Sequence, residues 1–190
     1  MNKLRLVLSF IALSTLVMSS TAAAAHPSVV LDPAGDIGSA TPSYYDIVKA
    51  KIHATGGQSE DYKAIVFSMN LAVPIPELSS DTFFAANWLL DTNSARPGFE
   101  YNVIVRWCTT VTHPRCQPGP AHWEGALNDF TAGGIQTYVS KFEIDGDTVQ
   151  LWLDPERIGS PSEFNWQGAT RSRGAQPVPE DDTDIASFRR

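Results

Sequence analysis

The sequence predicts an all-β protein: an antiparallel two-sheet β-sandwich, jelly-roll or immunoglobulin-like, with little helix. Proline and glycine each occur 13 times, and they divide the chain into short segments rich in β-branched and aromatic residues, which is typical of strands separated by turns. Six or more of these segments have the composition or alternation of strands, whereas only one short stretch favours a helix. Antiparallel sheets with one buried face fit this pattern best, and a closed barrel is the main alternative.

Four strands are expected in the first half of the chain. Residues 44–54 are predicted to form a strand with Val48, Ala50 and Ile52 facing inward, and residues 62–72 follow as a second alternating segment. FFAANWLLD and YNVIVRW alternate as well, and the polar segment DTNSARPGFE between them is a turn by composition. The apolar faces of these three later segments comprise Ile65, Phe67, Met69 and Leu71, then Phe84, Ala86, Trp88 and Leu90, then Tyr101, Val103, Val105 and Trp107.

Two more strands are expected in the second half, at residues 136–144 and 148–154. Asp145, Gly146 and Asp147 join them, and Asp-Gly between alternating segments is a strong hairpin signal. A short helix is predicted around residues 154–158, where Pro155 follows Asp154 as a capping residue. The sandwich is therefore expected to span residues 26–170. Residues 171–190 lack periodicity and contain two prolines, which predicts an extended or partly disordered C-terminal arm.

Residues 1–25 have the pattern of a cleaved secretory signal. Lys3 and Arg5 precede an apolar run at residues 6–18, and small residues follow up to Ala25. The run is shorter than the roughly 20 residues that cross a bilayer as a helix. We therefore expect a secreted protein, extracellular or periplasmic, without a membrane anchor. Loss of the two basic residues changes the formal net charge from -7 to -9, which disfavours nucleic acid and anionic membranes as partners.

The two cysteines, Cys108 and Cys116, are predicted to form a disulfide. An oxidising compartment favours this pairing, whereas a metal or redox site would need a C-x-x-C spacing or further soft ligands.

Acidic residues near the start of the mature chain suggest a calcium site. Asp32, Asp36 and Asp46 lie in or beside a stretch rich in glycine and proline, and hard cations prefer several oxygen ligands from a flexible loop. A sandwich could bring a second acidic group beside them, formed by Glu180, Asp181, Asp182 and Asp184. The alternative is that these aspartates only cap turns.

The order of several blocks resembles a known group of secreted domains. DPAGD, a YYDI strand, KAIVFSMNL, WLLDTN, YNVIV and VQLWLDP follow one another over most of residues 31–158. This order is similar to that of β-sandwich domains related to family 9 carbohydrate-binding modules and DOMON-like domains. The resemblance implies a two-sheet sandwich, often with bound calcium, and in some members a sugar or haem site.

Sugar binding would require aromatic rings with an open face and polar groups nearby. Trp88 and Trp107 share faces with core residues, so the other three tryptophans are the better candidates, and two of them are expected in loops. The candidate ligand-binding residues are Trp123, Trp152, Trp166, Glu124, Asn165 and Gln167. Burial of these rings at an end of the sandwich is the alternative.

No catalytic motif is present in the sequence: G-x-S-x-G, H-E-x-x-H and a phosphate loop are all missing. We therefore expect a non-catalytic module that is stabilised by calcium and binds carbohydrate. An extracellular structural domain or a domain that binds an extracellular protein is the alternative.

Overall fold

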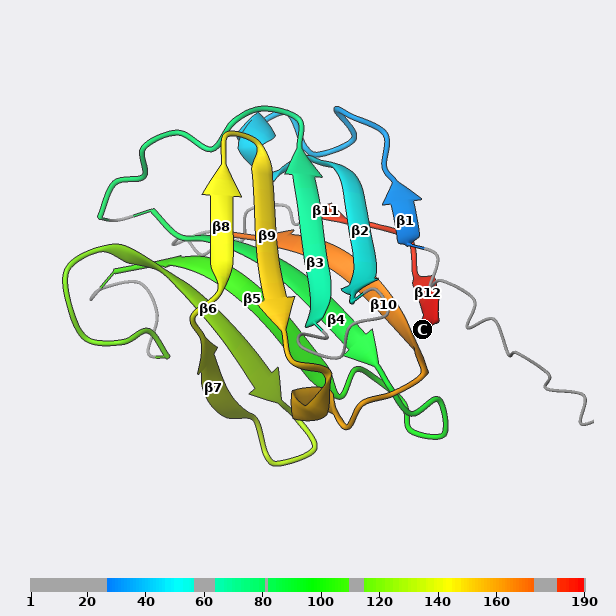
Figure 1. Cartoon of the computed structure of the whole chain (residues 1–190). Helices are drawn as coiled ribbons and strands as arrows, with labels where there is room; N and C mark the ends of the chain where they lie inside the picture. Colours follow the sequence, from blue (N-terminus) through cyan, green and yellow to red (C-terminus); the bar gives the residue numbers. More distant parts are fainter. Residues whose placement is uncertain (1–26, 57–63, 81, 110–114, 173–180, 190) are drawn as a thin grey trace, which may run out of the picture.

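The computed structural model describes residues 27–56, 64–80, 82–109, 115–172 and 181–189. Within these ranges the chain forms two antiparallel sheets packed face to face, with two short 3-10 helices (Figure 1). The predicted β-sandwich is therefore confirmed. The predicted signal, residues 1–25, lies outside the described residues, and no described helix is long and apolar enough to span a membrane.

Each sheet combines strands that are far apart in the sequence. The five-stranded sheet has the order β1 (Ser28–Leu31), β2 (Ile47–Thr55), β3 (Ala64–Leu71), β9 (Thr148–Leu153) and β8 (Phe142–Asp145). The seven-stranded sheet has the order β11 (Asp181–Asp182), β10 (Glu163–Arg171), β4 (Phe84–Asp91), β5 (Tyr101–Cys108), β6 (His122–Asp129) and β7 (Ile135–Val139), and β12 (Ala186–Arg189) also pairs with β10. The helices are η1 (Ser43–Tyr45) and η2 (Pro155–Ile158).

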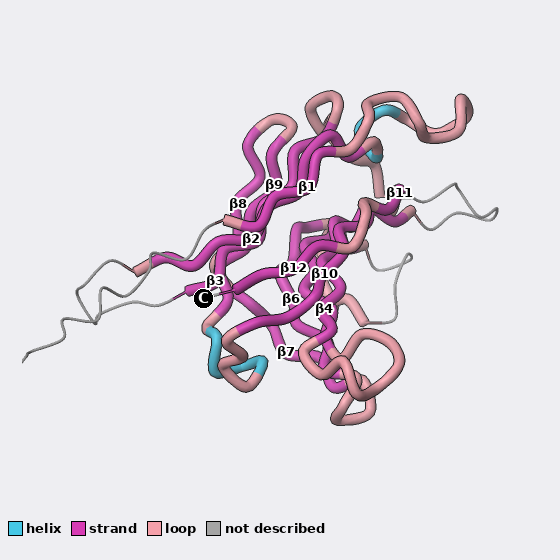
Figure 2. Tube along the Cα trace, turned by 90° about the vertical axis from the view of Figure 1, so that its right-hand side faces the viewer, coloured by secondary structure: helices cyan, strands magenta, loops and turns pink. Residues whose placement is uncertain are grey.

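The main core lies between the sheets, whose two layers are seen in Figure 2. The predicted inward faces of β3 and β4 are fully buried, and Phe67 packs against Trp88 with ring centroids 5.9 Å apart. Trp107 is only partly buried at the edge of this core. Successive side chains on a strand point to opposite faces. The residues of β4 and β5 that alternate with the core positions therefore lie on the outer face of the seven-stranded sheet.

A β-bulge changes which residues of β2 face the core. Val48 was expected to point inward, but the pairing with β3 shifts between Ile47 and Lys49. Ile47, Ala50 and Ile52 are buried, whereas Val48 is partly exposed. One extra residue in a strand reverses the alternation at that point, which a regular pattern does not reveal.

The segment predicted as one strand at residues 136–144 is two strands in different sheets. β7 pairs with β6, and β8 pairs with β9, so the chain changes sheet at Ser140 and Lys141. The hairpin at Gly146 is confirmed, with Asp145 paired to Thr148. The predicted helix is confirmed as η2, where the Asp154 side chain accepts a hydrogen bond from the Glu156 backbone N–H at 2.9 Å.

The described end of the chain belongs to the sandwich. β11 and β12 both pair with β10, and Phe188 is buried with its ring 4.9 Å from that of Phe164. Residues 181–182 and 186–189 are thus strands of the seven-stranded sheet, and residues 173–180 of the predicted arm lie outside the described residues.

Candidate functional site

A pocket of about 320 Å³ opens on the outer face of the seven-stranded sheet. We name it the outer-face pocket. Its floor is a small apolar cluster separate from the main core, to which Phe83, Ala85 and Ile104 contribute. The residues that line the pocket are Phe83, Ala85, Asn87, Leu89, Asn102, Ile104, Arg106, Arg115, Asn128, Phe130, Arg171 and Ser172.

The strand register explains why this face is hollow. Ile104 on β5 lies opposite Asn87 on β4 and Ala126 on β6, and Ala85 lies opposite Arg106. Small and medium side chains therefore occupy the middle of the face, with long polar side chains around them. The result is an apolar depression with a polar rim.

Three amide side chains form one part of the rim. Asn102 and Asn128 lie directly opposite each other on β5 and β6, and the Asn102 Nδ2 donates a hydrogen bond to the Asn87 Oδ1 at 3.1 Å. Asn87 and Asn128 are buried. The Asn102 Oδ1 is buried and has no hydrogen-bond partner among the residues that the structure describes. An unpaired buried acceptor costs free energy, so this oxygen is suited to receive a donor from a ligand.

A buried ion pair supports the opposite part of the rim. Arg106 and Glu124 are 1% and 4% exposed, and the Arg106 Nη2 donates to the Glu124 Oε2 at 3.0 Å. The same Nη2 lies 2.6 Å from the Arg115 carbonyl oxygen and 3.1 Å from the Gln136 Oε1. Arg106 thereby fixes the backbone at Arg115.

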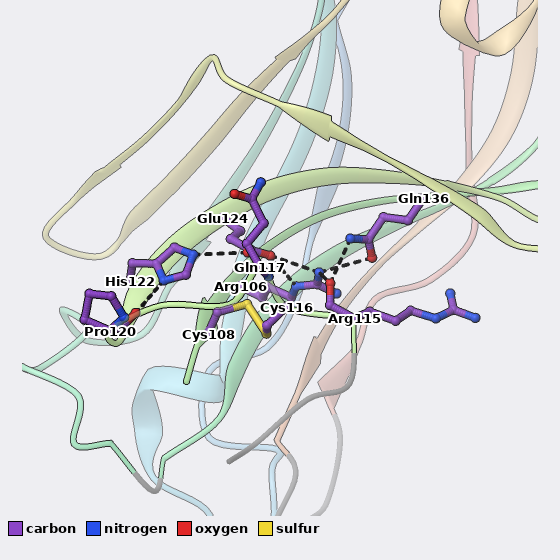
Figure 3. Close-up of a disulfide and its surroundings, with 9 residues drawn as sticks. All are labelled: Arg106, Cys108, Arg115, Cys116, Gln117, Pro120, His122, Glu124 and Gln136. Carbon is purple, nitrogen blue, oxygen red and sulfur yellow. Dashed lines mark hydrogen bonds and ion pairs between the residues drawn. A yellow bond between two sulfur atoms is a disulfide. The ribbon is translucent and has the colours of Figure 1, made fainter. Parts of the chain in front are cut away.

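The disulfide holds this network in place (Figure 3). Cys108 and Cys116 are bonded as predicted, with their Cα atoms 5.6 Å apart. The residue after Cys116 is Gln117, whose backbone N–H donates to the Glu124 Oε1 at 2.5 Å. Arg115, on the other side of Cys116, places its Nη1 3.5 Å from the Asn128 Oδ1 inside the pocket. The disulfide and the ion pair together hold the backbone of Arg115 at the rim.

The structure does not bring the predicted tryptophans onto one surface. Trp166 lies in β10 with 0% exposure, and its indole N–H donates to the Ser28 hydroxyl at 2.9 Å, so its assignment as a ligand residue is wrong. Trp123 lies in β6, not in a loop, and packs edge-on against Trp107 with centroids 5.5 Å apart. Trp152 is partly exposed on β9 of the other sheet, with the Lys141 Nζ 5.1 Å from its ring.

The predicted polar partners are also dispersed. Glu124 uses its carboxylate in the buried ion pair, which removes it from the set of ligand residues. The Gln167 Nε2 donates to the Thr183 carbonyl at 2.8 Å, and Asn165 lies 3.4 Å from Asp91 in a separate polar hollow.

Carboxylates from both ends of the described chain meet in a second cluster. Oxygens of Asp32, Asp36 and Asp181 all lie within 4.8 Å of one another. The Asp181 Oδ2 accepts from the Ile47 backbone N–H at 2.5 Å, which ties β11 to the start of β2. The Asp46 Oδ2 accepts from the Gly35 N–H at 2.7 Å and so holds the turn that precedes Asp36. We name Asp32, Asp36, Asp46 and Asp181 the carboxylate cluster.

The electrostatics of the carboxylate cluster are unfavourable without a cation. Burial, together with the negative charges of Asp181, Asp36, Asp184 and Asp46, raises the pKa of Asp32 to about 6. Burial also raises the pKa of Asp181. In addition, the Asp32 Oδ2 and the Asp46 Oδ1 are buried without a hydrogen-bond partner among the described residues, and the whole of Asp46 is only 2% exposed.

These residues fit a hard divalent cation. Calcium takes six to eight oxygen ligands in flexible geometry, and it would neutralise the repulsion and satisfy the orphaned oxygens. Of the three predicted ligands, Asp32 and Asp36 are brought together, and Asp46 lies beside them. The structure adds Asp181 to this candidate cation site. The sequence offered a signal for it, because Asp181 belongs to the second acidic group.

The sequence interpretation missed the outer-face pocket. Asn87, Asn102 and Arg106 are unremarkable polar residues in predicted strands, whereas Asn128 in β6 and Arg115 in the loop before it lie outside every predicted strand. For the first three a usable signal was their position: on a strand whose other residues form the core face, they must point outward.

Comparison with known proteins leaves the chain without a matched relative. No family model matches it, and neither the curated proteins nor the solved structures gave a match. The resemblance to family 9 carbohydrate-binding modules and DOMON-like domains therefore stays a prediction.

Proposed function

We propose that this protein is a secreted, non-catalytic binding module that is stabilised by calcium and takes a saccharide in the outer-face pocket. The observation that carries the proposal is the pocket itself, in which three amides on adjacent strands face an apolar floor. Its volume of about 320 Å³ lies at the lower end of the range for small-molecule sites.

The chemistry of the rim suits hydroxyl groups. A sugar hydroxyl both donates and accepts hydrogen bonds, and an asparagine amide offers a donor and an acceptor in the same way. The Asn102 Oδ1 is an acceptor with no partner in the described part of the chain. Phe130, at the rim, is 45% exposed and can stack against the apolar face of a pyranose ring.

Calcium would contribute stability, not chemistry, in this proposal. The carboxylate cluster joins the loop after β1 to β11, so a bound cation would cross-link the two ends of the described chain. A ligand that binds only the folded state raises its stability.

Isothermal titration against a panel of neutral and acidic oligosaccharides tests the saccharide proposal. We expect at least one saccharide to release or absorb heat with the parent protein, and Asn102→Ala to weaken that binding. Gln150→Ala is the matched control, since Gln150 is a partly buried amide residue on a strand of the other sheet. Absence of binding across the panel would contradict the proposal and favour a domain that binds an extracellular protein.

A further inference from the structure

The charge of the outer-face pocket is opposite to that of the chain. The chain has 21 acidic and 14 basic residues. Yet three arginines, Arg106, Arg115 and Arg171, line the pocket, and among the described residues that line it there is no aspartate or glutamate. A concentration of guanidinium groups in a concave site of an acidic protein favours a ligand with negative charge.

The arginines differ in what they can offer a ligand. Arg106 is buried, and its charge is matched by Glu124. The Arg171 Nη2 lies 3.2 Å from the Asp182 Oδ1, but this pair is partly exposed and therefore weak. Arg115 is an exposed residue, and its Nη1 lies 3.5 Å from the Asn128 Oδ1, beside the amides that would bind hydroxyls. Its exposure and its place beside the amides make Arg115 the best placed cation.

The backbone that carries the Arg115 side chain is also held in advance of binding. Its backbone carbonyl accepts from the Arg106 Nη2 at 2.6 Å and from the Gln136 Nε2 at 2.9 Å, and the disulfide at Cys116 is the next residue. A planar guanidinium binds a carboxylate through two parallel hydrogen bonds, and a backbone that is already fixed reduces the entropy lost on binding.

We infer that the ligand is an acidic saccharide, a uronic acid whose carboxylate binds Arg115 while its ring hydroxyls bind the amides of Asn102 and Asn128. This inference rests on the proposed function and adds the class of sugar to it. The pocket combines an apolar floor, a row of amides and a guanidinium, which together match a pyranose that carries a carboxylate.

The test compares ligands that differ only in charge. Short oligouronates, such as trigalacturonate and its glucuronate and mannuronate counterparts, are titrated beside their methyl esters at one fixed calcium concentration. We expect a free acid to bind on the order of tenfold to a hundredfold more tightly than its ester, the range for hydrogen bonds to a charged group. We also expect its affinity to fall as salt is raised.

Variants of one residue assign the effect. Arg115→Gln should bring the affinity for acid down to that for ester, and Arg115→Lys should restore part of the preference because it keeps the charge. Arg189→Gln is the control, since Arg189 is a surface arginine outside this pocket. Melting curves of all variants identify any that fail to fold.

The outcomes separate the two proposals. Equal binding of acid and ester, or an acid preference that survives Arg115→Gln, would overturn the uronate inference and leave the saccharide proposal standing. If neither the oligouronates nor any neutral saccharide binds, both proposals fail.

Discussion

Glu124→Gln is expected to destabilise the protein strongly, although the change is nearly isosteric. The variant leaves Arg106, which is 1% exposed, without a counter-charge, and it also turns an amide toward the Gln117 N–H or the His122 ring. Removing one partner of a buried ion pair costs about 3 to 5 kcal/mol, because the remaining charge is stranded away from water. For a protein of this size the melting temperature should fall by about 6 to 20 °C.

The chain offers a matched control for this variant. Glu163 and Arg189 also form an ion pair, at 3.1 Å, but they are 65% and 80% exposed. Glu163→Gln should change the free energy of unfolding by less than about 1 kcal/mol, since water screens an exposed pair.

Urea unfolding monitored by tryptophan fluorescence measures both variants. With an unchanged dependence on urea concentration, a lower midpoint for Glu124→Gln reports lost stability directly. The reasoning is refuted if the two variants shift the midpoint by similar amounts. The double variant Arg106→Met, Glu124→Leu should recover much of the stability, because an apolar pair leaves no stranded charge.

Three further predictions concern the carboxylate cluster and the disulfide. Calcium at a hundredfold excess over its dissociation constant should add about 2.7 kcal/mol of stability, and Asp181→Asn should reduce this gain while Asp145→Asn keeps it; identical melting curves in calcium and chelator would contradict the site. In chelator, the pKa of Asp32 is about 6 in the folded protein and 3.8 in the unfolded chain, so protonation of Asp32 favours the folded state and stability should fall as the pH rises through 6. Calcium should weaken this loss of stability, and a melting temperature in chelator that rises from pH 5 to pH 7 would contradict the prediction. Reduction of the disulfide between Cys108 and Cys116 should lower the free energy of unfolding by about 2 to 3 kcal/mol for so short a loop and weaken uronate binding; an unchanged urea midpoint and affinity would show that the loop is held by other contacts.

Much of the local structure follows from the sequence. The alternation of Phe84, Ala86, Trp88 and Leu90 defines a buried face whatever strands lie beside it, since successive side chains on a strand point to opposite sides. The turn at Gly146 similarly depends on a few adjacent residues, because its φ of 58° favours glycine. Trp166 shows where prediction from local sequence fails. Its polar neighbours Asn165 and Gln167 suggested a loop, but the side chain is buried between the two sheets.

Some features of the candidate sites likewise follow from the local sequence, whereas others depend on the tertiary structure. The sequence by itself determined that Asp32 and Asp36 share a turn and that Cys108 and Cys116 are close enough to bond, because a few residues of chain limit how far apart they can lie. Only the tertiary structure decided that Asp181 joins the first pair and that amides from β4, β5 and β6 meet at one pocket. The period of two assigns each residue to a face, but it does not state which strands are neighbours or where an outer face is hollow. Those depend on long-range pairing and packing, which stabilise the fold only once the whole sandwich has assembled.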